Sequence, residues 1–246
     1  MIVRQPARET RHCPSEMSLQ GNAALVMWHG VESSAREAHD DWHSHEHLME
    51  RLALPGFRRG RRCVSPDGER YFLMYEVDEL ETLTSAAYQA RLNDPSDWSK
   101  RVIPSIQNMN RTLCRALVSF GSGVGGWVGT RRLSVEPGGR QGLLDHLARL
   151  GAEGMTARPG VTGIHALEGD KTASALRTEE KNLRSTEDET ADLVVVVEGY
   201  DRERVRTALN DELGREALAQ CGGVEIGEVG LYQAVHVMTK PDVETG

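Results

Sequence analysis

The chain has 246 residues, of which 39% are hydrophobic and 27% charged, and its formal net charge is −8. Such a composition is ordinary for a globular protein, and the length allows one large domain or two of roughly 100–120 residues. An acidic chain without interleaved basic and aromatic residues is a poor match for nucleic acid, so no nucleic-acid partner is expected. The longest fully apolar runs, such as 23–28 and 193–197, are too short to cross a membrane.

The ends of the chain and its cysteines indicate a compartment. Residues 1–20 contain arginines but no apolar segment like that of a signal peptide, so we expect a flexible polar tail there and another at 241–246. The cysteines are far apart and form no CxxC motif; they are Cys13, Cys63, Cys114 and Cys221. We therefore predict free thiols in a reducing cytoplasm.

The first half of the chain predicts the order β-α-β-β-α-β. Apolar or alternating segments indicate strands at 22–31, 57–65, 70–78 and 109–120. Ser33-Ser34 offers an N-cap for a helix over 35–54, which Pro55-Gly56 ends, and a shorter helix is expected at 82–92. This order is the split βαβ, or ferredoxin-like, pattern.

The same order then begins again. Strands are predicted at 127–136, 158–167, 192–198 and 224–238, the last with a bulge at Gly227 or Gly230, and helices at 140–150 and 201–219. An acidic insertion, 171–190, interrupts the second half, and its role cannot be read from the sequence. We therefore predict an α+β protein of two ferredoxin-like repeats, 21–121 and 122–240, fused in one chain.

The glycine-rich segment 121–126 separates the two repeats. By letter it matches G-x-G-x-x-G, which binds dinucleotides when the glycines leave a strand and open a helix. Here they lead into another predicted strand, so we interpret them as a hinge. No organic cofactor is expected.

One segment, 40–52, concentrates side chains that could perform chemistry. At helical spacing His39, His43 and His47 share one stripe, because they lie four residues apart. A helix that only packs has little reason to collect groups that titrate near neutral pH. The functional site is therefore expected on this helix.

His47 with Glu46 is the leading candidate for a general acid/base, because a histidine beside a carboxylate suits proton transfer near neutral pH. The alternative is a polar helix face that only contacts solvent. His43 extends the stripe, and His29 would lie across a pocket from His47 if its side of the first strand faces the helices. The expected substrate-binding residues are Trp42, Glu50, Tyr75, Tyr88 and Trp98, although aromatic residues can equally be core.

A metal site is the alternative use of these histidines. His43 and His47, four residues apart on a helix, could bind a metal if His29 or Glu50 supplied a third ligand. Two ligands do not make a site, so no metal is expected in the main interpretation.

Trp42, Glu46 and His47, followed by Pro55-Gly56-Phe57, resemble the W-x-x-x-E-H segment and P-G-F strand start of the EthD-like branch of the dimeric α/β-barrel superfamily. The resemblance covers about 21–120, and 125–240 only through the order of strands and helices. It implies two ferredoxin-like sheets joined face to face into a barrel. This superfamily includes monooxygenases, isomerases, lyases, haem enzymes and plain binding proteins.

These observations predict a small-molecule enzyme of catabolic or secondary metabolism, a lyase, isomerase or cofactor-independent oxygenase. The alternatives are a metal- or haem-dependent enzyme using His43, His47 and His29, and a non-catalytic binding or scaffold protein. The second repeat keeps His146 among leucines, so we expect it to be structural. The partner is then a small-molecule substrate, and a homodimer of the whole chain stays open.

Overall fold

The structure, a computed structural model, describes residues 18–184 and 188–244. Within these residues, the first half of the chain forms strands β1 (Ala23–Val31), β2 (Phe57–Val64), β3 (Arg70–Val77) and β4 (Ile106–Gly121). The second half forms β5 (Trp127–Val135), β6 (Val161–Gly169), β7 (Leu193–Gly199) and β9 (Gly230–Thr239), with a short β8 (Gly223–Glu225) beside β5.

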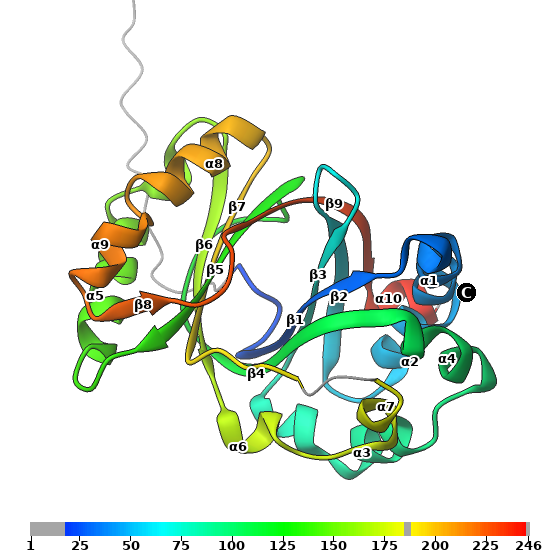
Figure 1. The fold of residues 1–246 in the computed structure, drawn as a ribbon. Helices are drawn as coiled ribbons and strands as arrows, with labels where there is room; N and C mark the ends of the chain where they lie inside the picture. Colours follow the sequence, from blue (N-terminus) through cyan, green and yellow to red (C-terminus); the bar gives the residue numbers. More distant parts are fainter. Residues whose placement is uncertain (1–17, 185–187, 245–246) are drawn as a thin grey trace, which may run out of the picture.

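The two halves share one strand order and close into one antiparallel barrel (Figure 1). The first half has the order β4-β1-β3-β2, and the second has the matching order β9-β5-β7-β6. Pairing of β4 with β6 and of β2 with β9 joins the two sheets at both edges. The predicted fold class, two ferredoxin-like repeats forming a barrel in one chain, is confirmed.

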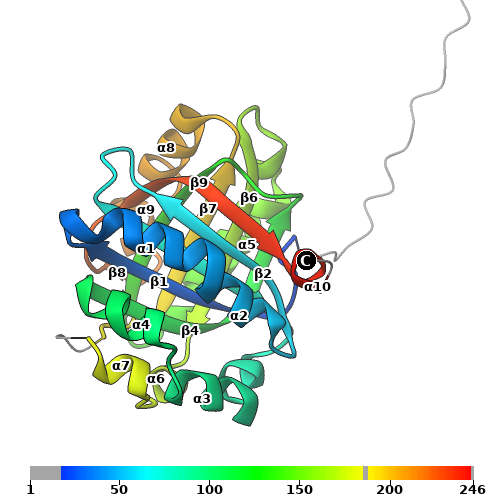
Figure 2. The same ribbon diagram turned by 90° about the vertical axis from the view of Figure 1, so that its right-hand side faces the viewer.

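The helices of the two halves cover opposite sides of this barrel (Figures 1 and 2). On the first half lie α1 (Arg36–Trp42), α2 (Leu48–Ala53), α3 (Ala86–Asn93) and α4 (Asp97–Val102). On the second half lie α5 (Arg140–Ala152), α8 (Arg202–Asn210) and α9 (Arg215–Ala219). One apolar cluster packs under each set of helices, and a third fills the opposite face of the sheet, inside the barrel.

The first helix differs from the prediction in its start and its middle. A 3₁₀ turn, η1 (Ser33–Ala35), precedes it, and no side chain caps α1, so the predicted serine N-cap is wrong. Between α1 and α2 the chain makes a π-helical turn, η2 (His43–His47), in which the Leu48 N–H bonds to the His43 carbonyl. Such π-turns are rare and often mark functional sites.

Other boundaries also shift. The helix expected at 82–92 is a 3₁₀ turn, η3 (Leu80–Thr84), followed by α3, and a further 3₁₀ turn, η4 (Ile103–Ser105), follows α4. The helix expected at 201–219 is broken into α8 and α9, and the strand expected at 224–238 is two strands, because Gly227 adopts a left-handed φ of 69°. A fourth 3₁₀ turn, η5 (Met155–Ala157), precedes β6.

The described ends of the chain are packed. Leu19 is 4% exposed, so the packed chain begins before residue 21; residues 1–17, most of the predicted first tail, lie outside the described residues. A short helix, α10 (Lys240–Glu244), stands where the second tail was expected, and the Lys240 ammonium donates to the Leu52 and Leu54 carbonyls at 3.0 Å. Cys63, Cys114 and Cys221 are free thiols, and Cys13 lies outside the described residues. None of the described helices has the length and apolar character that membrane crossing requires.

The described parts of the insertion, 171–184 and 188–190, lie along the half of β4 that β6 leaves unpaired. They form α6 (Lys171–Ser174) and α7 (Glu179–Asn182). The Ser174 hydroxyl accepts from the Leu113 N–H at 3.0 Å, and the Glu189 carbonyl accepts from the Arg111 N–H at 2.9 Å. An uncovered strand edge can pair with strands of other chains, and this segment covers the free edge of β4.

A buried ion network crosses the barrel interior. The Arg61 guanidinium lies 2.7 Å from the Glu198 carboxylate and 3.2 Å from that of Glu76. Arg59 makes two further hydrogen bonds to Glu76, at 2.8 and 2.7 Å. Glu76 and Glu198 hold matching places in β3 and β7, so one guanidinium links the two repeats.

Candidate functional site

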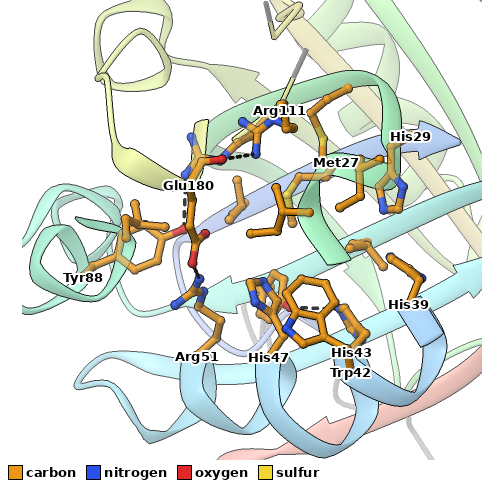
Figure 3. Close-up of a pocket in the computed structure, with 18 residues that line it drawn as sticks. Met27, His29, His39, Trp42, His43, His47, Arg51, Tyr88, Arg111 and Glu180 are labelled. Carbon is orange, nitrogen blue, oxygen red and sulfur yellow. Dashed lines mark hydrogen bonds and ion pairs between the residues drawn. The ribbon is translucent and has the colours of Figure 1, made fainter. Parts of the chain in front are cut away.

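A pocket lies between the first helix and the sheet of the first half (Figure 3). Its apolar wall is formed by Leu25, Met27, Leu73, Leu92, Ile103, Ile106 and Met109. The cavity measures about 40 Å³, which is room for two or three water molecules. An organic ligand must therefore displace side chains, and the flexible Met27 and Met109 are suited to give way.

Three histidines from the first helix form one wall of this pocket. His39 and His43 are fully buried, and His47 is 8% exposed. Their rings follow one another, with centroids 6.1 Å apart for His39 and His43 and 5.8 Å for His43 and His47. The predicted stripe thus forms, and it faces the sheet.

His29 reaches the same pocket from β1. Strand alternation places it on the side of Leu25 and Met27, as the sequence analysis expected. Its ring lies 5.2 Å from that of His39 and stacks on Tyr71 at 5.1 Å. It therefore lies at the His39 end of the pocket and not directly opposite His47 (Figure 3).

These histidines are neutral. Desolvation lowers the pKa of His43 and of His47 well below the usual value, and it lowers the pKa of His29 to about 3. Ring nitrogens that are buried without a partner among the described residues are Nε2 of His29 and His39, and Nδ1 of His43 and His47. Among the described residues no hydrogen bond or ion pair joins a carboxylate to His47, and burial is the main cause of its lowered pKa, so this geometry does not match the expected tuning of His47 by a neighbouring carboxylate.

The two glutamates beside the histidines do not line the pocket. The Glu46 carboxylate accepts from the Trp42 indole at 3.1 Å and from the Ser99 hydroxyl at 3.3 Å, so it ties the first helix to α4. The Glu50 carboxylate pairs with Arg91 at 3.2 Å. The prediction of Glu46 as the partner of His47 is therefore not matched by the geometry.

Only some of the aromatic residues that were predicted to bind substrate line the pocket. Trp42, Tyr75 and Tyr88 line the pocket, while Trp98 is only partly buried and packs against the neighbouring core. The Trp42 ring lies 4.3 Å from that of His47, and the Tyr75 hydroxyl lies 3.1 Å from Nε2 of His43. Burial raises the pKa of Tyr75, so its hydroxyl stays protonated.

The other end of the pocket holds charged residues that the sequence analysis missed: Arg51, Arg111, Glu180 and Arg184. Arg51 could have been found, because it continues the stripe of His39, His43 and His47 by four residues. Glu180 could not, since it comes from α7, 129 residues away in the sequence, and forms a buried ion pair with Arg51. Figure 3 shows Arg51, Tyr88 and Glu180 together at this end.

Metal binding finds no support in this geometry. Among residues 18–184 and 188–244, no group of three or more His, Cys, Asp or Glu side chains is arranged to hold a metal ion.

The glycine segment 121–126 joins β4 to β5, and the Gly125 N–H bonds to the Glu198 carboxylate at 3.0 Å. It does not open a helix, which a dinucleotide loop requires.

Solved structures share this architecture. An anthrone oxidase-like protein aligns with 91% of this chain and 96% of its own, with a TM-score of 0.61 and 14% identity. A candidate monooxygenase from Fusobacterium nucleatum aligns with 90% of this chain and 96% of its own, with a TM-score of 0.53 and 11% identity. A candidate monooxygenase from Lactobacillus acidophilus covers 89% and 97%, with a TM-score of 0.53 and 8% identity.

The barrel topology and these structures together define the class: the chain has the dimeric α/β-barrel fold, with both ferredoxin-like repeats in one polypeptide. No protein-family model matches the sequence, and no curated protein is similar to it. Placement in the EthD-like branch therefore stays a prediction.

Proposed function

We propose that the chain is a small-molecule enzyme that works without an organic cofactor, and that neutral His47 takes a proton from a weakly acidic group of an apolar substrate. The observation that supports this most is a pocket with an apolar wall in which histidine ring nitrogens are buried without a partner among the described residues. Burying such groups costs free energy, so their retention is best explained by use.

His47 is the best base among the four histidines. Its Nδ1 lacks a partner among the described residues, and the Trp42 ring packs beside the imidazole at 4.3 Å. His43 is held by the Tyr75 hydroxyl, and we assign it a positioning role. Because burial weakens His47 as a base, the proton it removes must be one that the substrate itself makes acidic, on a strongly activated carbon beside a carbonyl group or on a phenol.

The proposed step breaks a C–H bond beside a carbonyl group. The proton moves to the free ring nitrogen of His47, and the electron pair moves onto the carbonyl oxygen as an enolate. Return of the proton to another carbon gives an isomerase, loss of a neighbouring group gives a lyase, and reaction of the enolate with O₂ gives an oxygenase. All three predicted reaction types share this first step.

Deuterium exchange tests that step without knowledge of the product. The probes are anthrone and phenylpyruvate in D₂O, with loss of the methylene proton signal followed by NMR; anthrone is chosen because one protein of this fold is described as anthrone oxidase-like. We expect His47→Ala to reduce enzyme-dependent exchange about 10²–10⁴-fold. The matched control is His146→Ala in the second repeat, which should keep both exchange and melting temperature.

The outcome divides the alternatives. Equal exchange by wild type and His47→Ala would remove His47 as the base. Binding of a probe without exchange would favour the non-catalytic binding protein, and a Soret band in the purified protein would favour the haem enzyme.

A further inference from the structure

The charged end of the pocket contains more positive than negative groups. Three guanidinium groups line it, from Arg51, Arg111 and Arg184. Arg51 pairs with Glu180, and Arg184 forms a two-pronged pair with Asp188 at 2.7 and 2.8 Å. Each of these two arginines therefore has its own carboxylate.

Arg111 has none. It is 7% exposed, and the hydrogen bond that its guanidinium makes is to the Tyr88 hydroxyl, at 3.1 Å. Within residues 18–184 and 188–244, no carboxylate lies at ion-pair distance from it. Burying an unpaired charge lowers the stability of the fold. A bound anion beside Arg111 would offset that cost.

A second donor at this end also lacks a partner. Nη1 of Arg51 is buried without a hydrogen bond among the described residues, while Nη2 of the same group holds Glu180. Tyr88 lies between the two arginines, with Arg51 over its ring at 5.7 Å and Arg111 at its hydroxyl. Free N–H groups of two guanidiniums around one tyrosine make a receptor for an anionic oxygen group.

We propose that the substrate carries a carboxylate, which binds to Arg111 and Nη1 of Arg51 while its apolar body lies against the histidine wall. This inference rests on the proposed function and adds the class of substrate: an apolar monocarboxylate with an acidic C–H or O–H group. The apolar lining residues between the two ends of the pocket fit such a molecule.

Binding of paired probes tests the carboxylate. The probes are benzoate, phenylacetate and 3-phenylpropionate, each against its uncharged amide, measured by calorimetry on the full chain. We expect at least one acid to bind about 10-fold or more tightly than its amide, and Arg111→Gln to abolish that preference. The matched control is Arg115→Gln, the same change on β4 at an exposed arginine, which should keep it.

Melting temperatures give a test that needs no ligand. Arg111→Met should melt at or above wild type, because it removes an uncompensated buried charge. Arg51→Met should melt lower, because it leaves Glu180 buried and unpaired. Equal binding of acids and amides, no binding of any acid, or a destabilised Arg111→Met would each overturn the carboxylate site. Loss of exchange in His47→Ala would still support the proposed function.

Discussion

The two repeats have one topology, but they fill the space between helix and sheet differently. Aligning them at Glu76 and Glu198 places Leu133 where the first repeat has His29, and Val197 where it has Tyr75. The helix α5 presents buried leucines in place of the histidine stripe; they are Leu143, Leu144, Leu147 and Leu150. The second repeat therefore has apolar side chains in the places of His29, Tyr75 and the histidine stripe, although it buries the Arg131–Glu225 ion pair, with Arg131 at the place of Met27. The first repeat keeps the polar groups that line its pocket.

This difference shows what the barrel itself requires. Leucine and valine at the equivalent positions support the same strand order, so the fold does not need the buried histidines of the first repeat. The histidine of α5, His146, is not buried in the core as the three histidines of the first helix are. It is only partly buried, and its Nε2 bonds to the Glu212 carbonyl at 3.0 Å. Polar groups kept where apolar ones would suffice indicate a site, and the following changes test that contrast.

The largest effect on stability is expected at Glu180. Glu180→Gln leaves Arg51 charged in a site where it is 2% exposed, so the free energy of unfolding should fall by about 3–5 kcal/mol. The matched control in the second repeat is Glu212→Gln, which breaks the more exposed pair with Arg158 and should cost at most about 1 kcal/mol. Urea unfolding of both variants gives the comparison, and equal losses would contradict the assigned importance of the buried pair.

Acid sensitivity should come from the first repeat. His29 has a pKa lowered to about 3 in the folded protein against 6.5 in the unfolded chain, so the unfolded state binds the proton more readily. Its contribution is fully present above about pH 6.5 and is lost as pH falls toward 3, by about 2–3 kcal/mol at pH 4.5. His29→Leu, which copies Leu133 of the second repeat, should flatten the decline of melting temperature between pH 6.5 and 4.5. An unchanged slope would show that His29 titrates normally.

The residues of the site differ in how far the sequence alone could place them. The stripe His39, His43, His47 was predicted because helical spacing is a local property, and Arg51 lay on it unnoticed. The side chain of Glu46 could not be placed, since Ser96 before α4 and Ser99 within it, which donate to the carboxylate, are brought close only by the fold. Glu180 was out of reach for the same reason, because the insertion shows no sign in sequence of returning to the first repeat.

The fold itself was more predictable than its boundaries. Alternating apolar residues and Pro-Gly turns mark the strands of both repeats, so the order β-α-β-β-α-β was visible twice. The break between α8 and α9 was missed, because apolar spacing continues through Leu209 and Leu213 although the backbone turns. The closure of the two sheets into one barrel, through the pairs β4–β6 and β2–β9, was predicted only from the family resemblance.

The smallest effect is expected at Tyr75. Tyr75→Phe removes the hydroxyl that bonds to Nε2 of His43 and leaves that buried nitrogen without a partner, at a cost of about 1–2 kcal/mol. Tyr200→Phe on the surface is the matched control and should change the free energy of unfolding by less than about 0.5 kcal/mol. If the two variants unfold alike, the Tyr75–His43 bond contributes nothing measurable.

The ion network inside the barrel also bears on how the chain can evolve. In the fused protein Arg59 and Arg61 are balanced by Glu76 and Glu198. A barrel built from two copies of the first repeat would bury four guanidinium groups against two carboxylates, because the place of Glu198 would be taken by a second Glu76. Two buried positive charges would then lack a counter-charge, which such a small interior does not tolerate. Two copies of the first repeat alone should therefore not close into a stable symmetric barrel unless one of the two arginines is replaced.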